Sequence, residues 1–251
     1  MTIRRWRIFI WAANYFPIKV VKTKHMPVDG SNYMAVCHPH GMLPLSIGLT
    51  FGTESMDISH RIFPGHRCHI FSLWLMYVSP FLRELYHSMG GRPASDQAMT
   101  ELLTESKNSI AALVVGGARD MVVQRPGTIV RRRLGFCRIA LKTGTHLVPV
   151  ISFGEDQTFV PCQIMSKMVN WLMNWAVLIA VILVQGRWYT IIPHPVPITV
   201  VVGSPLVVSK NSNPTKQDIV DLNDRYCETL TKLYDDHKSK YGYENKPLVL
   251  L

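Results

Sequence analysis

The chain has 251 residues, of which 47% are hydrophobic and only 18% are charged, yet its formal net charge at pH 7 is +10. This length suits one domain, and the apolar but basic composition favours a membrane surface or a polyphosphorylated ligand over nucleic acid. The five cysteines are odd in number and never form a CxxC pair, so we expect free thiols rather than a disulfide framework.

Residues 1–16 form a basic arm that carries the tryptophans Trp6 and Trp11 among three arginines. Its apolar stretch is short and has no small-residue cleavage site, which argues against a signal peptide. Indoles beside cations are typical of a helix lying in the lipid headgroup region. We therefore expect an interfacial arm, the alternative being an arm that packs on the domain.

A His-Pro-His-Gly run at residues 38–41 follows the first predicted strand, 33–37. An imidazole titrates near neutral pH, so His38 or His40 could take a proton from an attacking hydroxyl as a general base. Many metal-dependent hydrolases also begin with His-x-His after a strand. The other histidines form no ligand array and no HExxH occurs, so we expect no metal.

A glycine pair, Gly116 and Gly117, directly follows the predicted strand 111–115. Backbone amides at such a turn can hold an oxyanion or a phosphate, and Asp120 could orient an imidazole. The alternative is an ordinary turn after a strand.

The densest basic region of the chain lies next, and it comprises Arg125, Arg131, Arg132, Arg133, Arg138 and Lys142. Such a cluster either cradles phosphates or is solvated or lipid-facing.

Residues 168–184 contain no charged side chain and end in an unbroken apolar run. About twenty apolar residues are needed to cross a bilayer, so the length is borderline. We expect an embedded or re-entrant helix here, and the alternative is a buried core helix.

The remaining elements alternate between strand and helix. Further strands are expected at 147–152 and 198–202, and helices at 73–89, 96–107 and 134–143, the last capped by Gly144. A C-terminal helix, 213–241, is expected to start with Asn213 as cap and Pro214 at its first position. This order predicts a single α/β domain, 1–251, with a mostly parallel sheet covered by helices on both faces.

Taken in order, the motifs resemble the diacylglycerol acyltransferase type 2 family, which includes monoacylglycerol and wax-alcohol acyltransferases. The matching pieces, spread over nearly the whole chain, are residues 14–17, 38–41, 63–65, 89–91, 115–118, 125–127, 135–136, 148–149, 153–155 and 197–203. Two departures stand out. Asp120 occupies a position where the family has glutamate, and Trp188 follows Gly186-Arg187 where the family often has Gly-Arg-Gly.

The resemblance implies a glycerolipid-acyltransferase-like enzyme of the endoplasmic reticulum membrane. It would transfer an acyl group from acyl-CoA to a lipid hydroxyl, and in the simplest case it would convert diacylglycerol to triacylglycerol. The His-Pro-His-Gly run would be the catalytic centre and would face the cytosol. His40 is the first candidate for the base and His38 the second, and Asp120 or Glu155 would orient the ring. Lipid-droplet association and self-association stay open.

In this scheme the Gly116 and Gly117 amides stabilise the oxyanion, and Arg131, Arg132, Arg133 and Lys142 attract the CoA phosphates. Acyl-CoA is a substrate, so no cofactor is expected. Two alternatives remain: a weakly active or inactive paralogue that binds acyl-CoA or neutral lipid, and a histidine-metal lipid hydrolase.

Overall fold

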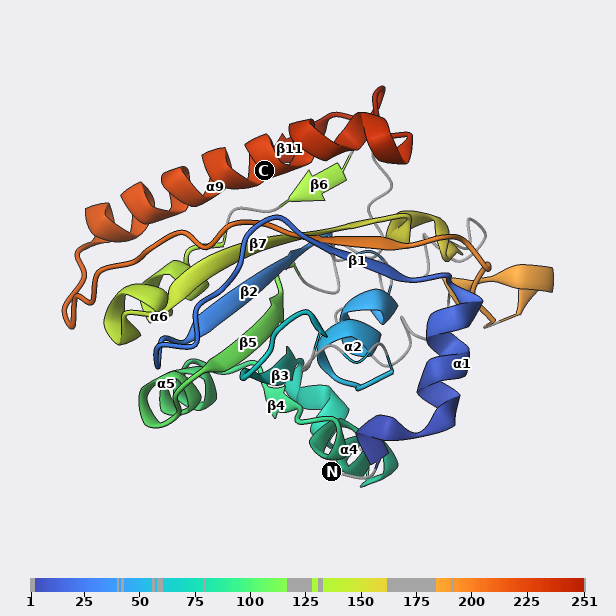
Figure 1. Ribbon diagram of the computed structural model, residues 1–251, viewed down its shortest axis with the longest axis horizontal. Helices are drawn as coiled ribbons and strands as arrows, with labels where there is room; N and C mark the ends of the chain where they lie inside the picture. Colours follow the sequence, from blue (N-terminus) through green and yellow to red (C-terminus); the bar gives the residue numbers. More distant parts are fainter. Residues whose placement is uncertain are drawn as a thin grey trace, which may run out of the picture.

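The computed structural model describes residues 3–39, 41, 43–55, 57, 61–78, 80–116, 128–130, 133–161, 184–190 and 192–250. Seven strands form one sheet in the order β1-β10-β7-β2-β5-β3-β4 (Figure 1). Their bounds are Lys19–Lys22 (β1), Tyr33–His38 (β2), Arg67–Ser72 (β3), Arg92–Pro93 (β4), Ser109–Val114 (β5), His146–Phe153 (β7) and Thr199–Val202 (β10).

Every neighbouring pair in the sheet is parallel except β10 with β7, which is antiparallel. The predicted mostly parallel α/β sheet is therefore confirmed. All six residues of β2 are buried, because β2 is a central strand that is covered on both faces. Strands in such a position are typically apolar along most of their length. Strand β1 was missed, since its Lys-Val-Val-Lys sequence is a short edge strand with charged ends.

The two faces of the sheet carry separate hydrophobic clusters. One cluster joins the sheet to α5 (Asp96–Glu105), α6 (Gly135–Thr143) and α9 (Lys216–Lys238). The other joins it to α1 (Arg7–Tyr15) and α2 (Leu45–Phe51). Figure 1 shows α9 along one side of the sheet and α2 on the other. Helix α6 ends at Gly144 in the left-handed conformation, as predicted.

The predicted helix 73–89 is wrong as a single element. The structure has a 3-10 turn, η2 (Trp74–Tyr77), and then α4 (Pro80–Ser88). Pro80 has no amide hydrogen and is tolerated in the first turn of a helix but not in its interior, so the helix starts at this residue.

The predicted start of the C-terminal helix at Asn213 is also wrong. Helix α9 begins at Lys216, and Thr215 and Asp218 form a reciprocal capping box. Pro214 restricts the residue before it to extended backbone, while the Thr215 hydroxyl satisfies the Asp218 amide. The helix ends at Lys238 and a 3-10 turn, η5 (Ser239–Tyr241), follows.

The remaining short elements lie outside the seven-stranded sheet. They are η1 (Ile3–Arg5), β6 (Thr128–Val130) paired with β11 (Leu248–Leu250), β8 (Val160–Pro161) paired with β9 (Val184–Gln185), η3 (Glu155–Gln157) and η4 (Arg187–Tyr189). Within the ranges described above, no helix has the length and hydropathy needed to cross a bilayer. The predicted membrane segment, 168–184, lies outside these ranges except for its last residue.

Candidate active site

The carboxyl edge of the parallel strands gathers the predicted motifs. His38 ends β2 and is paired with Ile151 of β7, and the Val115 amide after β5 donates to the Cys37 carbonyl over 3.3 Å. Gly116, with φ of 150°, and the Gly154-Glu155 turn therefore lie at the same edge as the His-Pro-His-Gly run. Ligands of open α/β sheets bind at this edge.

His38 is completely buried on the α9 side of the sheet. Its Nε2 atom lies 2.9 Å from the Tyr226 hydroxyl, which donates its own proton to the Val36 carbonyl over 3.3 Å. The His38 ring therefore carries its proton on Nε2 and donates it to Tyr226. Burial lowers the pKa of this imidazole from 6.5 to about 3, so the ring is neutral at physiological pH.

The other ring nitrogen of His38, Nδ1, is buried and has no hydrogen-bond partner among the described residues. A base must reach its substrate, whereas this ring packs under α9, where Tyr226 in turn contacts Phe136 of α6 with ring centroids 5.1 Å apart. The arrangement suits a residue that fixes the end of β2.

Replacing Tyr226 by Phe should reduce the free energy of unfolding by about 1–3 kcal/mol, because the His38 Nε2–H and the Val36 carbonyl would lose a buried partner. Urea unfolding measures this loss. Tyr241→Phe is the matched control, since Tyr241 is partly exposed and contacts Phe153 through its ring. Equal stability of the Tyr226→Phe protein and the wild type would contradict the bonding scheme.

Glu155 is the second buried polar group at this edge, with only 1% of its surface exposed. The Ser46 amide donates to Oε1 over 3.2 Å, and the Ser46 hydroxyl donates to Oε2 and lies 3.1 Å from the Ser152 hydroxyl. The first amides of α2 thus hold the carboxyl group, which suits the positive end of a helix. No sequence motif marks Ser46 or Ser152, and both were missed.

Burial raises the pKa of the Glu155 carboxyl from 4.5 to about 7, although hydrogen bonds from Ser46 and the Leu45 amide act in the opposite direction. The group therefore changes its charge near neutral pH, as a residue in proton-transfer chemistry must.

The Glu155 side chain also lies close to Gly41, the last residue of the His-Pro-His-Gly run. A Cβ atom added to Gly41 would lie 3.4 Å from the Glu155 Cγ atom, and Gly41 has φ of 58°, which favours glycine. Residues 34 and 36 of β2 face the α9 side together with His38, whereas Ser152 and Glu155 lie on the α2 side. The structure therefore brings Glu155 to Gly41 and separates it from His38.

Five of the other predicted site residues lie outside the described part of the chain, and Arg133 and Lys142 lie within it. His40, Gly117, Asp120, Arg131 and Arg132 lie outside the described residues. Arg133 is exposed and immediately precedes Leu134, the N-cap of α6. Phe136, which contacts Tyr226, lies at this same end of the helix.

Lys142 lies at the other end of α6. The helix leads through Gly144 into His146, which pairs with Tyr33 at the amino end of β2. A helix rises about 1.5 Å per residue, so Lys142 is roughly 10 Å along the axis from the start of α6. The structure does not bring it to the carboxyl edge.

The described cysteines are unsuited to covalent chemistry. Cys37, Cys68, Cys137 and Cys227 are buried and free. Burial raises the pKa of Cys68 and Cys137 to about 12, which keeps them as thiols. In the part of the chain that the structure describes, no group of three or more His, Cys, Asp or Glu side chains could hold a metal ion.

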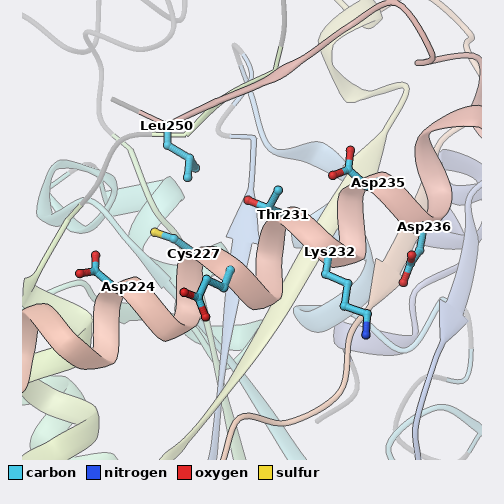
Figure 2. A pocket seen from close by; sticks show the side chains of 8 residues that line it. Asp224, Cys227, Thr231, Lys232, Asp235, Asp236 and Leu250 are labelled. Atoms are coloured by element: carbon cyan, nitrogen blue, oxygen red, sulfur yellow. The ribbon is translucent and has the colours of Figure 1, made fainter.

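A groove of about 740 Å³ along α9 is the larger of two described pockets, and its lining is acidic. Figure 2 shows Asp224, Asp235 and Asp236 spread along the helix, with Lys232 as the labelled cation. Lys238 binds Asp235 over 2.6 Å. A carboxylate-rich surface repels anions, so this groove does not suit the phosphates of acyl-CoA.

The backbone at Trp188 shows why the resembled family often has glycine at this position. It has φ of 54° and ψ of 33°, a left-handed conformation that favours glycine, and its side chain is 67% exposed. The Arg187 guanidinium stacks over its ring with 4.0 Å to the centroid. Glycine at this position would meet the same backbone requirement without strain.

Sequence comparison places the whole chain among known proteins. A family model described as diacylglycerol acyltransferase matches residues 1–251. Acyl-CoA wax alcohol acyltransferase 2 of Mus musculus is 34% identical, with 99% of this chain and 78% of that protein aligned. Diacylglycerol O-acyltransferase 2 of Homo sapiens is also 34% identical, with 96% of this chain and 65% of that protein aligned.

Among solved structures, the chain is similar to the 1-acyl-sn-glycerophosphate acyltransferase PlsC of Thermotoga maritima. The TM-score is 0.51 over 93% of this chain and 78% of that chain, at 13% sequence identity. This likeness shows a common fold.

Proposed function

Because the chain belongs to the diacylglycerol acyltransferase family, we propose that it transfers a fatty acyl group from acyl-CoA to the hydroxyl of a neutral lipid, with diacylglycerol as acceptor. That the chain is an acyltransferase follows from its family. The acceptor, the membrane-bound state and the location in the endoplasmic reticulum membrane, with the site facing the cytosol, belong to the proposal.

One observation carries the proposal: the side chain of the buried Glu155 lies close to Gly41, the last residue of the His-Pro-His-Gly run. Burial also raises the pKa of its carboxyl to about 7. A carboxylate beside this run can orient an imidazole and stabilise its protonated form. We assign that role to Glu155 and the role of base to His40. Asp120, the first candidate from the sequence, lies outside the described residues and is the alternative orienting carboxylate.

In the proposed reaction, His40 accepts the proton of the acceptor hydroxyl while the hydroxyl oxygen attacks the thioester carbon. Amides of Gly116 and Gly117 stabilise the oxyanion that forms. The carbon–sulfur bond then breaks, and the imidazolium returns the proton to sulfur. The products are an ester and free CoA thiol, so the transfer needs no serine or cysteine nucleophile.

The defining experiment incubates purified protein with labelled oleoyl-CoA and, separately, diacylglycerol, monoacylglycerol or a fatty alcohol, and then separates the lipids. Label in triacylglycerol supports the proposal. Label only in a wax ester or in diacylglycerol would correct the acceptor. Binding of acyl-CoA without transfer would indicate an inactive paralogue, and chelator-sensitive release of oleate would indicate a metal-dependent hydrolase.

The basic run provides a test of CoA binding with an internal control. Replacing Arg131, Arg132 and Arg133 together by Gln should raise the KM for acyl-CoA roughly tenfold, because hydrogen bonds to charged groups contribute about 1.5–3 kcal/mol. Lys142→Gln should leave this KM unchanged, since Lys142 lies at the amino end of β2. Steady-state kinetics at a saturating concentration of the lipid acceptor measure the KM for acyl-CoA of both variants. A KM of the triple variant equal to that of the wild type would assign the arginines to another role.

A further inference from the structure

Large apolar side chains are exposed on two elements that are far apart in sequence. Helix α1 and the residue before it expose Trp6, Ile8, Ile10 and Trp11, the last by 79%. The η2–α4 segment exposes Leu73, Trp74, Val78, Phe81 and Leu85, with Phe81 at 89%. Helix α4 has no buried residue among those described, and α1 buries only Ala13. Apolar patches of this kind mark contact sites.

Arg4, just before α1, lies near the turn that follows α4. It is only 8% exposed, and its guanidinium donates to the Phe51 carbonyl over 2.9 Å and to the Cys68 carbonyl over 3.3 Å. A Cβ atom added to Gly90, in the turn after α4, would lie 3.4 Å from Nη1 of Arg4. Figure 1 shows the start of the chain beside α4. Arg4 therefore packs on the domain, which was the alternative for the arm.

The charges around the exposed apolar residues are mainly positive. Arg5 and Arg7 are exposed at the start of α1, and Arg83 is exposed on α4 beside its partner Glu84. Tryptophan indoles with flanking cations suit the boundary between headgroups and acyl chains of an anionic bilayer.

We propose that α1 and the η2–α4 segment, which approach each other near Arg4 and Gly90, form one docking face for an anionic lipid bilayer; we call it the α1–α4 face. The proposal deepens the proposed function by giving the membrane-bound enzyme an orientation. Helix α1 packs on α2, and the amide and hydroxyl of Ser46 near the start of α2 hold Glu155. The α1–α4 face thus belongs to the same side of the sheet as the Glu155 carboxyl, opposite α9.

The test measures binding of the full chain to vesicles of phosphatidylcholine with phosphatidylserine, by flotation. Trp11→Gln and Phe81→Gln should each lower the partition constant roughly tenfold or more, because burying a large apolar side chain contributes about 1.5–3 kcal/mol. The effects should add in the double variant. Val207→Gln is the matched control, since Val207 is 65% exposed but lies outside both elements.

Activity in detergent micelles separates this proposal from the proposed function. The double variant should keep wild-type transfer activity in micelles and lose it on vesicles. A wild-type protein without transfer activity in micelles would contradict the proposed function but would leave the docking face untested by activity, and flotation would then decide it. Flotation of the double variant equal to that of wild type would overturn the docking face. The proposal would also be overturned if the wild type formed dimers without lipid and the double variant did not, because the face would then bind protein.

Discussion

His40→Ala should lower kcat roughly 10² to 10⁴-fold while leaving acyl-CoA binding intact, because a positioned general base contributes about that factor. The reason lies in its sequence position between Pro39 and Gly41, the latter close to the side chain of the buried Glu155. Transfer of labelled oleate gives kcat, and equilibrium dialysis gives binding. His25→Ala, which changes an exposed histidine, is the control and should leave both unchanged.

His38→Ala should behave differently. Its main effect should be a loss of about 2–4 kcal/mol of unfolding free energy, because it opens a cavity and leaves the Tyr226 hydroxyl without its partner. The kcat of the folded fraction should fall less than in His40→Ala. Full activity in a folded His40→Ala protein would remove His40 as the base, and an equal loss of kcat in both variants would mean that the two histidines act as a unit.

Glu155→Gln should change how stability depends on pH. The folded-state pKa of Glu155 is raised to about 7 by burial, so its contribution is fully present below pH 4.5 and is lost as pH rises through 7. Between pH 5 and pH 8 the wild type should therefore lose roughly 2–3 kcal/mol relative to Glu155→Gln. Urea unfolding at a series of pH values measures the difference.

Two further variants sharpen this test. Ser46→Ala removes the hydroxyl hydrogen bond that lowers the Glu155 pKa and keeps the one from the amide, so the loss of stability should shift to higher pH. Glu101→Gln changes an exposed carboxyl and should keep the wild-type pH profile. Parallel profiles for Glu155→Gln and wild type would show that the buried carboxyl does not titrate near neutrality. Loss of kcat in Glu155→Gln at all pH values would support its role beside His40.

The sequence predicted four of the seven strands of the sheet, and did not predict β1, β3 or β4. Strands 33–37, 111–115, 147–152 and 198–202 were predicted within one or two residues, because strands buried on both faces must be apolar throughout. Gly144 marked the end of α6 because a left-handed cap favours glycine. The ordered motifs identified the family, since their number and order are specific where each motif alone is not.

Only the tertiary structure decided which polar groups meet. Sequence reasoning treated His38 as a second candidate base, but Tyr226, 188 residues away, binds its ring under α9. Glu155 was a secondary candidate until Ser46, 109 residues away, and Gly41 were seen around it. Burial lowers the pKa of His38 and raises that of Glu155, where hydrogen bonds from Ser46 act in the opposite direction. These effects depend on contacts between strands and helices that form only on folding.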